Sequence, residues 1–322
     1  MRQFAKPKIV VSKCLEFDAC RYNGEMIPDV TIRNLQPFVT FIPVCPEVEI
    51  GLGTPRETIR IVEENGENRL VQPSTREDVT EKMEQFSNDF LQTVPDVDGF
   101  ILKNRSPSCG TRDVKIYSSF EKAPAKGKGP GLFGGAVIKK FSHLPIEEEG
   151  RLSNFIIREH FFTRLFTIAY YKMIKHNKNM KDLVSFQSDN KYLFMAYNQV
   201  KQKELGRIIA NHKNEKIEVV FENYEKTLYE LFMRTPRYTS NVNVCEHIFG
   251  YFKTKLKKQE KDYFLNLIQK YIEKKIPLSS LLAILKSWAL RFDEKYLLRQ
   301  TYFEPYPEAL VEISDSGKGR DY

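Results

Sequence analysis

The sequence predicts two domains of different class. An α/β domain with a mostly parallel, Rossmann-like sheet is expected over residues 1–152, followed by an all-α domain over residues 153–322. Residues 1–150 contain 12 of the 16 Gly, 12 of the 16 Pro, and 20 Lys and Arg against 22 Asp and Glu. Residues 151–322 contain 28 of the 40 aromatic residues, and 30 basic against 20 acidic residues. Two domains with different roles is the simplest interpretation.

The composition is that of a globular chain, because 41% of the 322 residues are hydrophobic and 29% are charged. No stretch approaches the roughly 18 apolar residues that span a membrane, and the most apolar segment, residues 154–171, contains four charged or His residues. The N-terminus lacks the pattern of a signal peptide. We therefore expect a cytoplasmic protein without a membrane partner and without a disulfide framework.

Three short apolar, β-branched runs predict buried strands at Lys8–Ser12, Val39–Val44 and Gly99–Leu102. Between the second and third runs, Ser74 and Glu77 form a capping-box pattern that predicts the start of a helix. Apolar residues then recur at helical spacing, at Val79, Met83, Phe86 and Phe90. Strands that alternate with helices indicate a largely parallel sheet.

A cysteine follows each predicted strand: Cys14, Cys45 and, after a longer turn, Cys109. Because the carboxyl ends of parallel strands share one edge of a sheet, where ligands bind in open α/β folds, three thiols distant in sequence could meet there. Cys20 follows Cys14 by six residues and could approach the same place.

The residue types narrow the chemistry of such a cluster. No His precedes His143, which disfavours Cys/His zinc sites and a Cys–His nucleophilic pair, and no CxxC motif occurs. Thiolates without imidazole suit iron–sulfur clusters, which normally have four Cys ligands. Three ligands would leave one iron open to substrate, by analogy with catalytic zinc sites. The alternative is that these cysteines are small buried apolar residues, as we expect for Cys245.

The surroundings of the cysteines resemble the thiouracil desulfidase (TudS-like) family across residues 5–152. The motifs are CLEFDACRYNG from Cys14, CPEVEIGLGTPR from Cys45, KNRSPSCG from Lys103 and GLFGGAVIKKFSHLPIEEEGRL from Gly131. The resemblance implies a [4Fe-4S] cluster bound by three cysteines, Cys14, Cys45 and Cys109, with one open iron that takes sulfur from a thiolated pyrimidine. Cys20 is the alternative ligand.

The same resemblance implies that Glu47 is the catalytic carboxylate and Ser106 the catalytic hydroxyl. A carboxylate two residues from a ligand is placed to activate water or move a proton, and a hydroxyl can stabilise developing negative charge. The segment EIGLGTPR departs from relatives, which commonly have a doubled Gly before the Leu, and this affects the expected shape of the pocket.

Six further residues are predicted substrate contacts: Arg21, Gly51, Gly53, Arg56, Lys103 and Ser108. For the glycines the alternative is a structural turn, and for the arginines a salt bridge near the site. Ala123–Gly135 is predicted to be a mobile loop, because it contains five Gly and two Pro. The acidic run Glu147–Glu149 is expected at the domain junction, as a solvated or capping segment.

The second half shows helical periodicity. A stripe of Tyr263, Phe264, Leu267, Ile268, Tyr271 and Ile272 precedes a break at Pro277, and Leu278–Leu290 predicts the next helix. Basic residues crowd two segments: Lys172, Lys175, Lys178 and Lys181, and Lys253, Lys255, Lys257, Lys258 and Lys261. Such runs are usually solvated faces, but residues 151–322 together have a net charge of +10, which makes nucleic acid a candidate partner of this domain. Arg234, Arg237 and Tyr238 could add to that surface.

Residues 155–310 resemble the YbgA-like helical domain, and the similarity is clearest in the segment Phe186–Ala210. Its fusion to a TudS-like domain is similar to the RudS-type tRNA 4-thiouridine desulfidases, in which the helical domain is thought to hold the tRNA. The resemblance does not indicate which residues contact RNA.

The sequence therefore predicts an iron–sulfur desulfidase that removes sulfur from 4-thiouridine in tRNA, giving uridine and sulfide by a non-redox hydrolytic substitution. One alternative is a desulfidase of free thiouracil or thionucleosides. Another is a non-enzymatic, metal-containing RNA-binding protein in which all four N-terminal cysteines are ligands. Sequence alone does not predict the oligomeric state or the acceptor of the sulfur.

Overall fold

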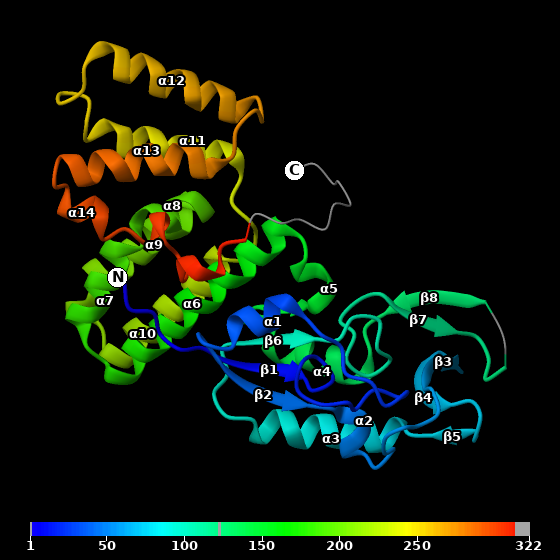
Figure 1. Cartoon of the computed structure of the whole chain (residues 1–322). Coiled ribbons are helices and arrows are strands. Elements are labelled where there is room, and N and C mark those ends of the chain that lie inside the picture. Colours follow the sequence, from blue (N-terminus) through cyan, green and yellow to red (C-terminus); the bar gives the residue numbers. More distant parts are fainter. Residues whose placement is uncertain (1, 122–123, 313–322) are drawn as a thin grey trace. The chain divides into compact units, whose positions relative to one another are not determined.

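The computed structural model describes residues 2–121 and 124–312 of the chain (Figure 1). The chain divides into two compact units. One contains the residues up to Ala169 together with the segment that begins at Pro307, and the other is Tyr170–Tyr306. The first unit is α/β and the second is helical, so the predicted fold classes are confirmed.

A parallel sheet forms the centre of the first unit. Its strands are β1 (Lys8–Ser12), β2 (Thr40–Val44), β6 (Gly99–Leu102) and β9 (Ile146–Glu148), in the order β2-β1-β6-β9. The apolar residues of β1 and β6 are completely buried, as expected for strands covered on both faces. The three strands predicted from sequence are therefore confirmed.

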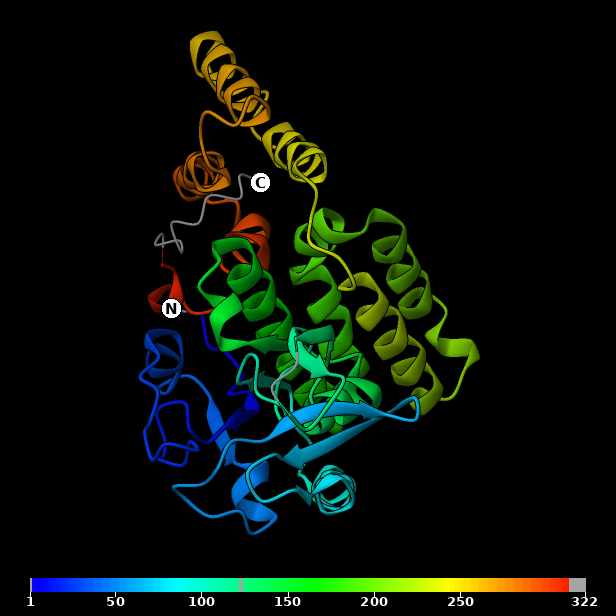
Figure 2. The same cartoon turned by 90° about the vertical axis from the view of Figure 1, so that its right-hand side faces the viewer.

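The order of the strands reverses next to β1. The chain passes from β1 through α1 (Val30–Leu35) to β2 on one side, and then returns through α3 (Thr80–Thr93) to β6 on the other side. The helices α1 and α3 accordingly lie on opposite faces of the sheet (Figures 1 and 2). In open α/β sheets, ligands bind outside the carboxyl ends of the strands at such a switch point.

The predicted start of α3 is wrong by several residues. Glu77 belongs to a short strand, β5 (Glu77–Asp78), so the pattern formed with Ser74 caps no helix. The helix begins at Thr80, whose backbone N–H donates to Asp78 Oδ1 at 2.9 Å. The hydrogen bonds that β5 makes with a neighbouring strand take precedence over the local capping pattern.

A second sheet was not predicted. It contains β3 (Arg60–Glu64), β4 (Glu67–Gln72), β5, β7 (Val114–Tyr117) and β8 (Ala125–Gly129), in the order β5-β4-β3-β7-β8. β3 and β4 form a hairpin whose two loop residues, Asn65 and Gly66, both have positive φ. An Asn-Gly pair is the typical sequence of this tight turn, so a local signal for the hairpin was present.

The prediction of a loop over Ala123–Gly135 is also wrong, although Ala123 itself lies outside the described residues. The segment forms β8 and then the first part of α4 (Leu132–Phe141). Pairing with β7 supplies backbone hydrogen bonds for β8. The glycines before and within α4 serve close packing rather than mobility, as the site shows.

The remaining helices of the first unit are α2 (Pro46–Glu49) and α5 (Glu149–Leu152), with a 3-10 turn at Glu308–Leu310. The long helix α6 (Phe155–Asn177) leads into the second unit. There follow α7 (Met180–Asp189), α8 (Lys191–Tyr197), α9 (Gln199–Ala210), α10 (Ile217–Leu231), α11 (Tyr238–Gly250), α12 (Lys258–Ile272), α13 (Leu278–Arg291) and α14 (Lys295–Leu298), with 3-10 turns at His212–Asn214 and Thr301–Phe303.

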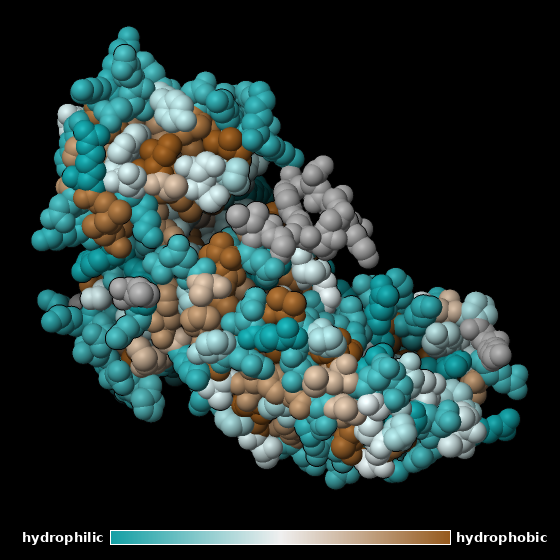
Figure 3. Space-filling view, in the orientation of Figure 1, coloured by the Kyte–Doolittle hydropathy of each residue, from teal (hydrophilic) through white to brown (hydrophobic). Residues whose placement is uncertain are grey.

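The second unit is held together by an aromatic core. Tyr171, Phe186 and Tyr224 are fully or almost fully buried and their rings contact one another. The predicted helix after Pro277 is confirmed, and the buried face of α12 comes from the predicted stripe, whereas its Tyr263 is 58% exposed. The outer surface of α12 is hydrophilic (Figure 3). None of the described helices is long and apolar enough to cross a membrane.

Candidate active site

The carboxyl edge of the parallel sheet contains a cavity of about 490 Å³ that all four N-terminal cysteines line. Cys45 directly follows β2, Cys14 follows β1 after one residue, and Cys109 lies in the loop after β6. The strand-end argument therefore correctly predicts that these three thiols share one place. Cys20 lines the same cavity, and its carbonyl oxygen accepts a weak hydrogen bond from Cys45 Sγ at 3.9 Å.

The environment of these thiols disfavours thiolates without a bound cation. Burial and, next, the charge of Cys45 raise the pKa of both Cys14 and Cys20 to about 12. Burial raises the pKa of Cys109 well above its ordinary value, with Cys45 and Cys14 as further causes. Thiolates that repel one another in a buried site are stabilised by a cationic metal centre, which displaces their protons.

The thiols that line the cavity are a donor set that suits an iron–sulfur cluster. Within residues 2–121 and 124–312, no three His, Cys, Asp or Glu side chains are arranged to hold one metal ion. No His is among the described residues that line the cavity, so the ligand types there are the four cysteine thiols and the carboxylate of Glu47, which its partners already engage. Cysteine thiolates are the usual ligands of a [4Fe-4S] cluster, whose several irons need ligands placed around a cage rather than at one point.

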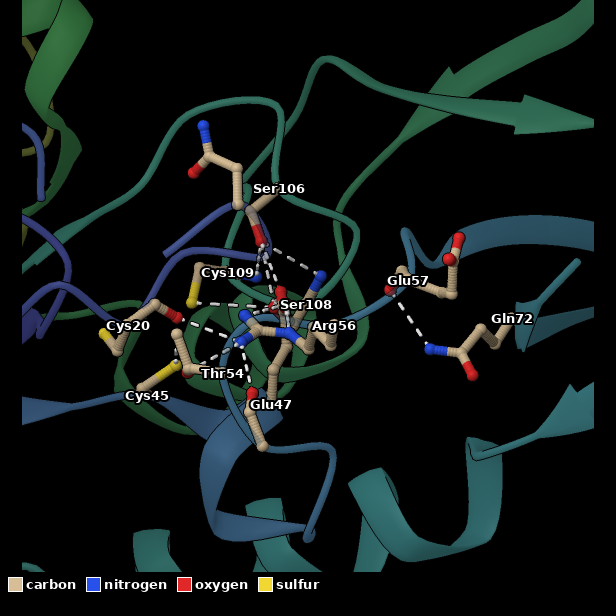
Figure 4. A network of polar contacts seen from close by, with 12 residues as sticks. Cys20, Cys45, Glu47, Thr54, Arg56, Glu57, Gln72, Ser106, Ser108 and Cys109 are labelled. Carbon is tan, nitrogen blue, oxygen red and sulfur yellow. Dashed lines mark hydrogen bonds and ion pairs between the residues drawn. The ribbon is translucent and has the colours of Figure 1, made fainter. Parts of the chain in front are cut away.

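Glu47 is the centre of a polar network beside the cysteines (Figure 4). It lies in the single turn of α2, which begins with Pro46 directly after Cys45. One carboxylate oxygen accepts from the Ser108 hydroxyl at 2.5 Å and from the Ser106 hydroxyl at 3.3 Å. The other forms an ion pair with Arg56. The network thus joins the loop after β2 to the loop after β6.

Ser106 organises the loop that carries Cys109. Its hydroxyl oxygen accepts from the backbone N–H of Cys109 at 3.1 Å and lies 2.9 Å from the Ser108 hydroxyl. Ser108 is fully buried, and its hydroxyl also lies 3.8 Å from Cys109 Sγ. Of the two hydroxyls, only that of Ser106 belongs to a residue that lines the cavity, so the predicted substrate contact at Ser108 is a supporting position behind the wall.

Arg56 holds Glu47 in place. Its side chain is only 4% exposed, and Nε donates to Glu47 Oε2 at 2.9 Å. Nη1 donates to the carbonyl oxygens of Gly53 at 2.8 Å and of Cys20 at 3.0 Å. The guanidinium group is therefore fully engaged, which matches the salt-bridge alternative for this residue. Gly51 and Gly53 have positive φ in the turn before it and do not line the cavity.

Lys103 reaches the cavity from the end of β6, and its ammonium group forms an ion pair with Glu149. Glu149 also accepts from the backbone N–H of Asn104 at 2.7 Å. The neighbouring Glu148 accepts from the backbone N–H of Thr111 at 2.6 Å. Both carboxylates are buried, so the solvated alternative of the expectation is wrong for them. Glu148 is at the N-cap position of α5 but its side chain makes no capping hydrogen bond, and both carboxylates instead hold the loop of Cys109.

Two glycines of the motif GLFGG, which the sequence analysis assigned to a mobile loop, bring α4 against this loop. An ideal Cβ on Gly131 would lie within 3.0 Å of the backbone oxygens of Pro107 and Ser108. A Cβ on Gly134 would lie equally close to the backbone oxygens of Cys109 and Gly110. The glycine-rich motif GLFGG is therefore needed for contact between backbones.

Arg21, a predicted substrate contact, lines the cavity, and its ion pair with Glu25 at 3.3 Å is the salt bridge given as the alternative for this residue. The sequence analysis missed Thr58, Ile59 and Arg105, which form another part of the wall. These residues come from the approach to β3 and from the loop after β6. No local pattern marks Thr58 and Ile59, which only the packing of the second sheet brings to the site, whereas Arg105 lies in the motif KNRSPSCG directly before Ser106.

The fold and the site define an α/β domain with a cysteine-lined cavity at the switch point of a parallel sheet. Residues 9–149 match the family model "2-thiouracil desulfurase", and residues 191–307 match a family of unknown function, DUF1722. The uncharacterized protein YbbK of Bacillus subtilis is 36% identical over 147 residues, which are 44% of this chain and 95% of YbbK. The N-terminal unit of the chain therefore belongs to the 2-thiouracil desulfurase family.

Two further proteins are similar to parts of the chain. The uncharacterized protein YbgA of Escherichia coli is 24% identical over 156 residues, which are 48% of this chain and 92% of YbgA. A solved structure described as the [4Fe-4S]-dependent thiouracil desulfidase TudS is 27% identical and covers 46% of this chain and 93% of its own, with a TM-score of 0.34.

Proposed function

We propose that the chain removes sulfur from 4-thiouridine in tRNA by hydrolysis. The proposed chemistry rests on one observation. In a domain of the desulfurase family, the cysteines at the strand ends and Glu47 with its hydrogen-bond network line the same cavity. In the proposed reaction, water adds its oxygen to the carbon of the thiocarbonyl group, the C–S bond breaks and sulfide leaves. No electrons are gained or lost, so the reaction needs no redox partner.

Cys14, Cys45 and Cys109 would hold a [4Fe-4S] cluster. When bound, the cluster supplies an open, Lewis-acidic iron that binds sulfur and weakens the C–S bond. The named solved relative is described as [4Fe-4S]-dependent, and the thiols that line the cavity of this chain are a suitable donor set. Cys20 would remain a free thiol in the wall.

In this proposal Glu47 would accept the proton of the attacking water. Its Oε1 is near the cavity and accepts from two hydroxyls, which orient the carboxylate, while Arg56 holds Oε2. Ser106 lines the same cavity, and its hydroxyl would turn its one proton from Glu47 to negative charge that develops on the substrate. Proton transfer to a positioned carboxylate typically contributes about 10²–10⁴-fold to the rate.

The helical unit supplies candidate contacts to tRNA. Several of its lysines are neutralised: Lys175 pairs with Glu225, Lys178 with Glu218 and Lys255 with Glu294. Five other basic side chains are exposed and form no ion pair among the described residues: Arg234, Arg237, Lys253, Lys257 and Lys258. Such groups can neutralise phosphates, while the thiolated base leaves its stack to reach the catalytic cavity.

The test is the 4-thiouridine content of bulk tRNA after incubation with anaerobically reconstituted protein, measured by mass spectrometry of nucleosides. Conversion to uridine by the intact protein, and not by Cys109→Ser, is the expected result. Absence of conversion by protein that contains its cluster would overturn the tRNA substrate. Turnover of free thiouracil in the same preparation would then assign the reaction to free thiopyrimidines.

A further inference from the structure

Among the described residues that line the catalytic cavity, Tyr22 is the only one with an aromatic ring. Apart from the cysteines, the apolar part of the wall otherwise consists of Val44, Ile59 and Pro107. The Tyr22 side chain is 43% exposed, whereas Val44 and Ile59 are buried, so Tyr22 belongs to the solvent-facing side of the wall. None of the steps in the proposed reaction uses this ring.

A tight turn carries Tyr22. The carbonyl oxygen of Arg21 accepts from the backbone N–H of Gly24 at 2.9 Å, and Gly24 has a positive φ of 74°, which a glycine adopts without strain. The backbone N–H of Arg21 donates in turn to the Glu25 carbonyl oxygen at 3.3 Å. The segment is therefore held by its own backbone hydrogen bonds, although residues 22–26 are exposed.

Arg56 fastens this turn to the catalytic carboxylate. Its backbone N–H donates to the Tyr22 carbonyl oxygen at 2.8 Å, and its Nη1 donates to the Cys20 carbonyl oxygen at 3.0 Å. The same guanidinium group forms the ion pair with Glu47 (Figure 4). The position of Tyr22 in the wall is thus set by the residue that also positions Glu47.

A cation orients the ring of Tyr22. The guanidinium group of Arg21 lies over this ring, 5.4 Å from its centre, and pairs with Glu25 at 3.3 Å. Such a cation is attracted to the face of an aromatic ring and holds it in place. In the part of the chain that the structure describes, no other aromatic ring or cation contacts Tyr22. The ring therefore keeps a face that a flat ligand in the cavity could cover.

The proposed substrate needs such a partner. A thiolated pyrimidine is flat, and the groups named in the proposed reaction act on the sulfur and the carbon at its edge, which leaves both ring faces without a contact. A base that leaves its stack in RNA also loses its stacking neighbours, and an aromatic side chain in the pocket replaces them. Because every base has a π face, this contact does not depend on the identity of the base.

We propose that Tyr22, oriented by Arg21, stacks on the pyrimidine ring of the substrate while the sulfur of that ring faces the cysteines. This inference rests on the proposed function and deepens it, because it names the residue that holds the reacting ring. Free 4-thiouracil has the same ring as 4-thiouridine in tRNA. The contact therefore serves both substrates equally, unlike a contact to phosphate.

The test compares Tyr22→Leu with Tyr22→Phe in the full-length, cluster-loaded protein. Leu is apolar but has no π face, whereas Phe keeps the face and loses only the hydroxyl. For tRNA that contains 4-thiouridine and for free 4-thiouracil alike, we expect kcat/KM to fall about tenfold or more in Tyr22→Leu and to stay within about twofold of wild type in Tyr22→Phe. Met26→Ala is the matched control and should keep wild-type kinetics, because Met26 is also 43% exposed in the same segment but does not line the cavity.

A second readout does not depend on turnover. Equilibrium dialysis measures the Kd of 4-thiouracil for the cluster-loaded Glu47→Gln protein, alone and combined with each Tyr22 variant. The Kd should rise about tenfold with Tyr22→Leu and stay unchanged with Tyr22→Phe. An equal loss of affinity in both variants would assign the contact to the hydroxyl and overturn the stacking, as would an unchanged affinity in Tyr22→Leu. Failure of wild type to act on tRNA would instead overturn the proposed function, and the dialysis would still test Tyr22.

Discussion

The carboxylate of Glu47 receives hydrogen bonds on one oxygen from Ser108 and Ser106 and an ion pair on the other from Arg56. Ser106 and Ser108 come from the loop after β6 and Arg56 from the segment before β3, so the orientation of this one side chain depends on two separate segments at the carboxyl edge of the sheet. A carboxylate held in this way loses little conformational freedom when it takes part in a reaction.

Replacement of Glu47 by Gln should abolish turnover and leave the cluster in place. Gln keeps the shape of the side chain but cannot accept a proton, so we expect kcat to fall by about 10²–10⁴-fold. Iron content and the visible absorption of the cluster provide the independent readout. Glu49→Gln, in the same turn of α2 but exposed, is the control and should keep activity; full activity of Glu47→Gln would exclude Glu47 as the base.

Single Cys→Ser variants distinguish a metal site with three cysteine ligands from one with four. In the three-ligand model, Cys109→Ser loses most of its iron and Cys20→Ser keeps both its iron and its activity. Cys245→Ser, in the core of the helical unit, controls for the loss of a buried thiol. Loss of iron from Cys20→Ser, measured by iron and sulfide analysis, would support four-cysteine ligation and the non-enzymatic alternative.

At the scale of elements, the close packing of α4 against the Cys109 loop predicts that a side chain at Gly134 destabilises the N-terminal unit. Gly134→Ala places a Cβ within 3.0 Å of two backbone oxygens, which can move away only if the loop shifts. We expect a loss of about 1–3 kcal/mol in the free energy of unfolding and a lower iron content. Gly135→Ala is the matched control, since its Cβ would meet only the Pro130 side chain at 3.4 Å or more and Ala favours a helix. Equal stability of the two variants in thermal unfolding would contradict this account.

The helix α6 contains a carboxyl group with a strongly shifted pKa. Burial raises the pKa of Glu159 from 4.5 to about 7, against the opposing charge of Arg158. The folded state therefore binds this proton more tightly than the unfolded chain. The contribution of protonated Glu159 to the free energy of unfolding is fully present below the pKa that this group has in the unfolded chain. It is lost as pH rises towards 7, the pKa in the folded state.

Glu159→Gln should remove this dependence. Urea unfolding at about pH 5 should show little difference between the variant and wild type, whereas at about pH 8 the variant should be more stable by about 1–3 kcal/mol. A difference of the same size at both pH values would indicate lost contacts rather than titration.

At the scale of the whole molecule, the division of charge predicts two different responses to salt. If the basic residues bind RNA, kcat/KM for tRNA should fall steeply, by about 10³-fold or more, between about 50 and 200 mM salt. Activity on free 4-thiouracil should hardly change, because that substrate carries no phosphate. Parallel salt titrations of both activities check this, and a tRNA activity that is insensitive to salt would remove the electrostatic argument.

The sequence by itself determined the two fold classes, the strands of the parallel sheet and the meeting of Cys14, Cys45 and Cys109. These features depend on local periodicity and on the rule that carboxyl ends of parallel strands share an edge. Only the tertiary structure decided the roles of Glu148 and Glu149 and the close packing of Gly131 and Gly134. A charge or a glycine has the same local signal whether it faces solvent or another segment, because its partners are distant in sequence and are brought to it only by folding.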